Sequence, residues 1–99
     1  MSLLVKTAQN EIRQAILDAA GRAVAAGELT AEALSGFHIE VPGNRLNGDF
    51  SANAAMAWAK DLKMPPRKTA ELLTTRMDLS DTFLDRCEVA GPGFMNFYL

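Results

Sequence analysis

The fold is decided by the last stretch of the chain, DRCEVAGPGFMNFYL (residues 85–99). Two runs with strand-forming character, residues 85–89 and 94–99, flank the turn sequence Ala90-Gly91-Pro92-Gly93, whose two glycines permit a tight or bulged connection. The stretch therefore predicts a β-hairpin. Side chains alternate along a strand, so one face of the second strand is wholly apolar and should meet the core: Met95, Phe97 and Leu99. The opposite face should point outward: Phe94, Asn96 and Tyr98.

Three helices are predicted before the hairpin. Residues 6–26 carry apolar side chains at the helical period together with many alanines, and Gly27 should end this helix. A second helix should cover residues 51–62, with Trp58 on its buried face rather than serving as a base-stacking platform. A third should begin after the two prolines, because proline suits a first turn, and should run to about Met77.

Between the first two helices, the sequence FHIEV (residues 37–41) alternates apolar and polar residues and predicts a half-buried strand. Its apolar members should face the core: Phe37, Ile39 and Val41. His38 and Glu40 should then lie on the other face, where an exposed histidine is the default. A short helical turn over residues 31–34 is expected before this strand, and a loop over residues 42–49 after it.

Composition limits the classes of function. The chain has 99 residues, enough for one domain, and a net charge of −2, so it is not a polycation that binds nucleic acid through bulk charge. Four cations nevertheless cluster within nine positions: Lys60, Lys63, Arg67 and Lys68. Such a cluster can contact phosphates, although charge alone favours a solvated helix end. No apolar run is long enough for a membrane helix and no secretory signal is present, so the protein is expected to be cytoplasmic.

The usual catalytic and metal-binding patterns are absent from the sequence. Cys87 is the only cysteine and His38 the only histidine, which excludes an internal disulfide and argues against a zinc site. No phosphate-binding loop of Walker type is found, and no base is placed to activate a nucleophile, so Cys87 is interpreted as a structural thiol. The residues instead indicate a binding platform, because an outward aromatic beside an amide can stack on an unpaired RNA base and recognise its edge.

Two segments resemble the amino-terminal domain of arginyl-tRNA synthetases. The first, GDFSANAAM (residues 48–56) followed by Ala59-Lys60 and Pro66-Arg67, is similar to that family's GDYATN-AM…AK…PR pattern. The second, VAGPGFMNF (residues 89–97), is similar to its closing VAGPGFINF strand. The order and spacing of the two segments also fit. The resemblance implies a single α+β domain over residues 1–99, with helices packed on one face of a small antiparallel β-sheet.

The resemblance also implies a function, which is contact with the D-loop at the elbow of arginine-accepting tRNA. Phe94 would stack on a D-loop base and Asn96 would hydrogen-bond to its edge. Four residues are candidate contacts to the RNA backbone: Lys60, Lys63, Arg67 and Lys68. The family's enzyme joins arginine to tRNA using ATP and magnesium, but its HIGH and KMSK signatures do not occur here. The resemblance therefore implies that the ATP, magnesium and arginine sites lie outside this chain, in a catalytic domain of the same polypeptide.

Two other interpretations stay open at this point. The chain could be a free-standing paralogue that acts as a protein-interaction adaptor through its outer sheet face. A small unrelated enzyme is a third class, against which the missing catalytic patterns argue. Leu99 follows directly after a strand and is expected to mark a boundary within a longer protein. A reading frame that continues into a nucleotide-binding domain would favour the synthetase, and a stop codon the adaptor.

Overall fold

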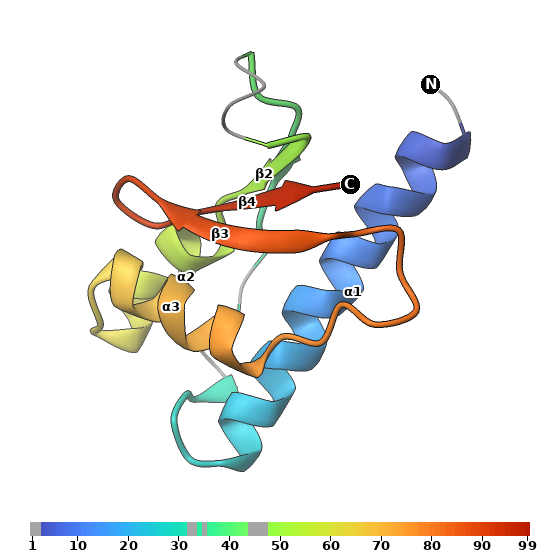
Figure 1. Ribbon diagram of the computed structural model, residues 1–99. Helices are drawn as coiled ribbons and strands as arrows, with labels where there is room; N and C mark the ends of the chain where they lie inside the picture. Colours follow the sequence, from blue (N-terminus) through green and yellow to red (C-terminus); the bar gives the residue numbers. More distant parts are fainter. Residues whose placement is uncertain (1–2, 32–33, 35, 44–47) are drawn as a thin grey trace.

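Three helices pack against one face of an antiparallel sheet in the computed structural model, which describes residues 3–31, 34, 36–43 and 48–99 (Figure 1). The helices are α1 (Leu3–Ala25), α2 (Ala54–Leu62) and α3 (Pro66–Arg76). The strands, in their spatial order, are β1 (Ile39–Glu40), β2 (Phe50–Ala52), β4 (Phe94–Tyr98) and β3 (Arg86–Ala90). All three neighbouring pairs are antiparallel. The predicted α+β class is therefore confirmed.

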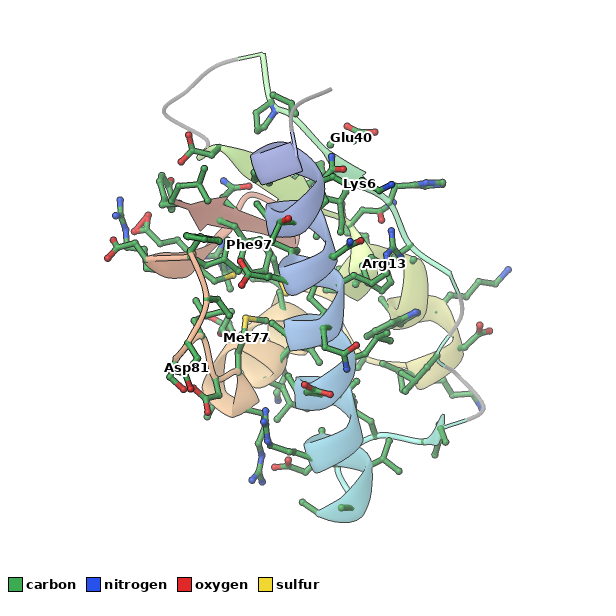
Figure 2. The ribbon with its side chains drawn as sticks, turned by 90° about the vertical axis from the view of Figure 1, so that its right-hand side faces the viewer. Lys6, Arg13, Glu40, Met77, Asp81 and Phe97 are labelled. Carbon is green, nitrogen blue, oxygen red and sulfur yellow. The ribbon has the colours of Figure 1, made fainter. Side chains whose placement is uncertain are left out.

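Helix α1 follows the predicted apolar stripe. Ile12 and Ile16 are fully buried, and the rest of its buried stripe consists of alanines, whose small side chains let α3 approach closely. The helix ends at Ala25, and Gly27, the predicted stop, lies just beyond it with a φ of 78°. The amides of Gly27 and Glu28 donate to the carbonyls of Val24 and Ala23, a pattern that satisfies the last free carbonyls of a helix. Figure 2 shows α1 facing the reader, lying across the rest of the molecule.

Strand β2 corrects the prediction for the second helix, which was expected to begin at Ser51. Residues Phe50–Ala52 form a strand instead, and α2 begins only at Ala54. Tertiary pairing overrides the helical pattern here, because Phe50 and Ala52 are buried opposite Phe97 and Met95 of β4. A side chain at Gly48, which has a φ of 90°, would lie 2.8 Å from the Phe97 carbonyl oxygen, so glycine is needed for β2 to enter the sheet.

Asn53 joins the strands to α2. Its Oδ1 accepts the His38 amide at 2.7 Å, and its own amide donates to the His38 carbonyl at 3.1 Å. Both backbone groups of His38 are thus satisfied beside β1. The asparagine ends the β1–β2 pairing one residue before the helix starts, which explains why the strand and the helix follow each other so closely.

Two residues expected in the core are exposed. The strand predicted over residues 37–41 contains only Ile39–Glu40, and Val41 beyond it is 67% exposed. Leu99 lies one residue after the end of β4 and is 50% exposed. Side chains alternate between the two faces of a sheet only where the strand is paired. Val41 and Leu99 lie beyond the paired residues, so the alternation does not direct them into the core. The expected turn over residues 31–34 and the expected loop over residues 42–49 fall partly outside the described residues.

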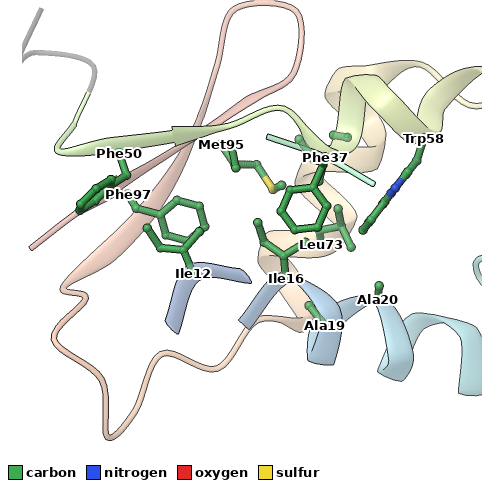
Figure 3. Packing of buried hydrophobic residues seen from close by; sticks show 14 of the residues in the cluster. Ile12, Ile16, Ala19, Ala20, Phe37, Phe50, Trp58, Leu73, Met95 and Phe97 are labelled. Atoms are coloured by element: carbon green, nitrogen blue, oxygen red, sulfur yellow. The ribbon is translucent and has the colours of Figure 1, made fainter. Parts of the chain in front are cut away.

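The core lies between the helices and the inner sheet face (Figure 3). Phe97 of β4 points toward Ile12 of α1, with Phe50 beside it. Trp58 is fully buried and meets Phe37 edge-on, with ring centroids 5.5 Å apart. Trp58 is therefore a core residue, as the sequence predicts. Over the part of the chain described, no helix is long and apolar enough to cross a membrane.

Candidate nucleic-acid interface

No helix of the described residues lies on the outer face of the sheet, and the strand register fixes which side chains lie on that face. Glu40 pairs with Ser51, Ser51 pairs with Asn96, and Asn96 pairs with Glu88. Directly paired residues of antiparallel strands project from the same face. These residues therefore form one row across all four strands, on the side away from α1. Phe94 and Tyr98 lie on the same face, two residues before and after Asn96 on β4.

A hollow of about 400 Å³ lies on this outer face. Two proline-glycine turns border it, residues 42–43 and 91–92. Five residues of the strands line it: Glu40, Ser51, Ala90, Phe94 and Asn96. Its volume is at the lower end of the range of roughly 300–1,000 Å³ that holds small ligands, which suits a single base. The structure thus places Phe94 and Asn96, the two predicted base-contacting residues, beside one hollow.

Phe94 and Asn96 differ in exposure. Phe94 is 40% exposed, so part of its ring is open to a stacking partner. Asn96 faces outward as predicted but is only 4% exposed, because neighbouring strands enclose it. The Ser51 hydroxyl donates to its Oδ1 at 3.0 Å. The pair therefore combines an accessible aromatic ring with an amide that its surroundings hold in place.

None of the four predicted cations lines the hollow, but one is bonded to a turn that borders it. Arg67, in the first turn of α3, donates from Nη1 to the carbonyl of Gly91 at 2.8 Å, and Gly91 lines the hollow. The approach of α3 requires Gly93, whose φ is 141° and where a side chain would lie 2.8 Å from the backbone of Pro66. The remaining three cations are exposed but do not line the hollow: Lys60, Lys63 and Lys68.

The far end of the outer face is occupied by an ion network. The Arg86 guanidinium lies 3.9 Å from the centre of the Tyr98 ring and pairs with Asp85 at 3.0 Å and with Glu88 at 3.4 Å. The pKa of Tyr98 is raised from its ordinary value, first by burial and then by the Glu88 carboxylate nearby. Because Arg86 covers one face of Tyr98, Phe94 is the more accessible aromatic of β4.

The thiol and the histidine lie outside the hollow. Cys87 is half-buried among residues that pack on the core, and burial raises the pKa of its thiol to about 12. At neutral pH the thiol is therefore protonated and a poor nucleophile, consistent with a structural role. His38 is exposed, as the sequence predicts. Within the described ranges, no group of three or more histidine, cysteine or carboxylate side chains could hold a metal ion.

Ser51 and Glu40 are the lining residues that sequence reasoning missed. Ser51 was assigned to a helix, and Glu40 was placed only on a strand face of unknown surroundings. Neither belongs to a motif with a chemical role, and both reach the hollow through the pairing of β1 with β2 and of β2 with β4. The only sequence signal was the short alternation in FSA (residues 50–52) after Gly48, which is too brief to identify a strand by itself.

The fold and the hollow together define a small α+β domain in which the described helices lie on one face of the sheet and the hollow lies on the other. The chain belongs to the family of arginyl-tRNA synthetase N-terminal domains, since the model of that family, "Arginyl tRNA synthetase N terminal domain", matches residues 6–99. It is 41% identical over 99 residues to an arginine–tRNA ligase of Acetivibrio thermocellus and 40% identical over 99 residues to one of Caldanaerobacter subterraneus subsp. tengcongensis. It is 42% identical over 96 residues to that of Symbiobacterium thermophilum. The chain spans only 17–18% of the length of these relatives.

Proposed function

We propose that this chain is the part of an arginine–tRNA ligase that contacts the D-loop of arginine-accepting tRNA. The observation that carries this proposal is the hollow on the helix-free sheet face, which Phe94 and Asn96 line together. D-loop bases that are unpaired can be turned out of the RNA, and such bases are recognised by stacking combined with hydrogen bonds to their edges. An accessible ring and a fixed amide two residues apart on one strand supply both contacts.

Phosphate contacts would come from the side of the hollow where α3 begins. Arg67 is bonded from Nη1 to the Gly91 carbonyl beside the hollow, and its Nε lies 4.0 Å from the Glu71 carboxylate. Its remaining donors could bind a phosphate oxygen. Lys60, Lys63 and Lys68 lie on α2, at its end and on α3, where they can add weaker contacts. With a net charge of −2, the chain should bind RNA weakly by itself and chiefly orient it.

The rest of the reaction is assigned to other parts of the polypeptide. In this proposal, a catalytic domain of the same chain binds ATP, magnesium and arginine and forms the ester bond to tRNA in the cytoplasm. This assignment follows from the names of the relatives, which are arginine–tRNA ligases more than five times as long as the matched region. The contribution of this domain would then be to raise the affinity for the correct tRNA, not to carry out chemistry.

Phe94→Ala tests the proposal, with Phe83→Ala as its matched control. Both rings are exposed, by 40% for Phe94 and 61% for Phe83, but Phe83 does not line the hollow. We expect Phe94→Ala to weaken binding to arginine tRNA by about 1–3 kcal/mol, the usual cost of losing a stacked base, and Phe83→Ala to leave it unchanged. Equal binding by both variants and the unsubstituted chain, each shown to be folded by circular dichroism, would contradict the proposal and favour an adaptor role.

A further inference from the structure

The Asn96 side chain lines the hollow, and its amide oxygen is already engaged. Its Oδ1 accepts the Ser51 hydroxyl at 3.0 Å, which fixes the orientation of the amide plane. No described residue accepts a hydrogen bond from Nδ2, although the side chain as a whole is only 4% exposed. Since no buried side-chain nitrogen or oxygen of the described residues lacks a partner, Nδ2 must reach the surface, and the hollow is the space that Asn96 lines. Asn96 therefore presents a hydrogen-bond donor to a ligand in the hollow.

Glu40 supplies a free acceptor beside that donor. It pairs with Ser51 across β1 and β2, lines the hollow and is exposed. Glu88, on the other side of Asn96, is engaged by Arg86 at 3.4 Å, whereas the ion pairs found among the described residues do not include Glu40. Of the two carboxylates in the row, Glu40 is the one available to a ligand.

A donor beside a carboxylate distinguishes between bases. Cytosine presents an exocyclic amino group next to a ring nitrogen that accepts, and adenine does the same. Uracil has a single ring N–H between two carbonyl oxygens, so a carboxylate that approaches this N–H also meets an oxygen of like partial charge. A carboxylate in the hollow equally repels a phosphate. The arrangement therefore suits the edge of an amino-bearing base.

We propose that Glu40 is a specificity-determining residue of this hollow and that Ser51 is the positioning residue that aims the Asn96 amide, so that together they favour a base with an exocyclic amino group over uracil. This inference rests on the proposed function, in which a base occupies the hollow. Asn96 matches the asparagine of the family's closing strand pattern. Ser51, in contrast, occupies the position where the family pattern GDYATN has alanine, so the hydroxyl that orients the amide is a departure of this chain from that pattern.

The test is an NMR titration of the isotope-labelled chain with cytidine and with uridine. The two nucleosides have the same ring size and no charge, so stacking on Phe94 and phosphate contacts do not separate them. We expect both to shift the signals of Phe94 and of the Asn96 side-chain amide, with cytidine binding roughly threefold or more tightly. Glu40→Gln should bring the ratio of the two affinities toward one, because a glutamine amide can donate to uracil as well as accept.

Two further variants separate the role of Ser51 from a general loss of structure. Ser51→Ala frees the amide to turn over and should reduce the preference for cytidine, while Ser51→Thr keeps the hydroxyl and should retain it. Glu88→Gln is the matched control, because it changes the carboxylate that Arg86 already engages. It should leave the preference unchanged.

Equal affinity for the two nucleosides would overturn the inference, as would a preference that survives Glu40→Gln, or the absence of any shift at Asn96. Its failure differs from failure of the proposed function. The chain could bind an arginine tRNA more tightly than the same tRNA with an altered D-loop and still show no preference between cytidine and uridine. That result would contradict only this inference. If the chain binds the two tRNAs equally, the proposed function itself is contradicted.

Discussion

The Asn96 side chain is both nearly buried and part of the lining of the hollow. The residue is almost enclosed by its neighbours on β2 and β3, yet it lines an open hollow. Burying a polar side chain is costly unless its groups are bonded, and the Ser51 hydroxyl satisfies the oxygen. The nitrogen is left for solvent or a ligand. An amide held in this way loses little side-chain entropy when it binds a base, which makes it a better recognition group than a mobile surface residue.

The Cys87 thiol provides a prediction about reactivity. Because burial raises its pKa to about 12, iodoacetamide at pH 8 should alkylate the folded chain far more slowly than the chain unfolded in urea. Mass spectrometry over a time course measures both rates. Equal rates in the two states would contradict the burial of the thiol, and Phe83→Ala provides a folded control with the same single cysteine.

The same shift predicts a dependence of stability on pH. The folded pKa of the thiol, about 12, lies above the ordinary value of 9.0, so above pH 9 the unfolded chain loses this proton while the folded chain keeps it. The contribution of Cys87 to the free energy of unfolding is therefore complete below pH 9 and is lost as the pH rises toward 12. Urea unfolding at pH 8 and pH 10 should show a decline that is smaller in Cys87→Val. An identical decline in both proteins would contradict this account.

The elements that the sequence predicts well are those with a long pattern. Helix α1 repeats its apolar spacing along all 23 of its residues. The hairpin has a glycine-rich turn between two strand-forming runs. Both patterns can therefore be recognised in the sequence alone. Strand β2 has three residues and β1 has two, and each forms only because a partner strand lies beside it. The burial of Asn96 and the lining of the hollow by Ser51 and Glu40 depend on those two strands, so neither could be predicted from local pattern.

Two glycines in different elements should respond oppositely to alanine. Gly21 lies within α1, near its carboxyl end, is exposed, and has no atom within 4 Å of the position that a side chain would occupy. Gly21→Ala should therefore stabilise the chain by about 0.5–1 kcal/mol through helix propensity and a less flexible unfolded state. Gly48→Ala should destabilise it, because the added carbon meets the Phe97 carbonyl oxygen at 2.8 Å. Chemical unfolding measures both. A stable Gly48→Ala variant would show that the pairing of β2 with β4 is not as described.

The end of α2 offers a variant that separates stability from RNA contact. Lys63 adopts a left-handed conformation with a φ of 55°, which costs a side-chain-bearing residue about 1 kcal/mol relative to glycine. Lys63→Gly should accordingly raise the free energy of unfolding by up to about 1 kcal/mol. If Lys63 contacts a phosphate, the same variant should bind arginine tRNA less tightly and lower the salt slope by about one. Tighter binding by the more stable variant would exclude the contact.

At the scale of the whole molecule, one face of the sheet packs on the core and the other carries the hollow. The helices cover the inner sheet face, while the start of α3 packs against the hairpin turn through Pro66 and Gly93 and through the bond from Arg67 to Gly91. The cation at the rim is therefore attached to the turn that borders the hollow. This connection allows base contact and phosphate contact to be made in a fixed relative position, even though the chain carries a net charge of −2.

The few cations also limit how binding depends on salt. Four candidate side chains, Arg67 and the three lysines around it, can displace at most about four counterions, so the slope of log K against log salt should be no steeper than about −4. Binding measured by fluorescence anisotropy between 50 and 300 mM salt, roughly, gives this slope. A much steeper slope would mean that further parts of the surface contact the RNA, which the distribution of charge on this chain does not support.

The central claim is tested most directly by binding this chain to arginine tRNA and to the same tRNA with its D-loop bases replaced, at several salt concentrations. The account predicts weaker binding to the altered tRNA at every concentration, with the same salt slope for both, because the hollow loses its base while the phosphate contacts remain. Equal affinity for the two tRNAs would contradict recognition of the D-loop and reduce the interaction to charge alone.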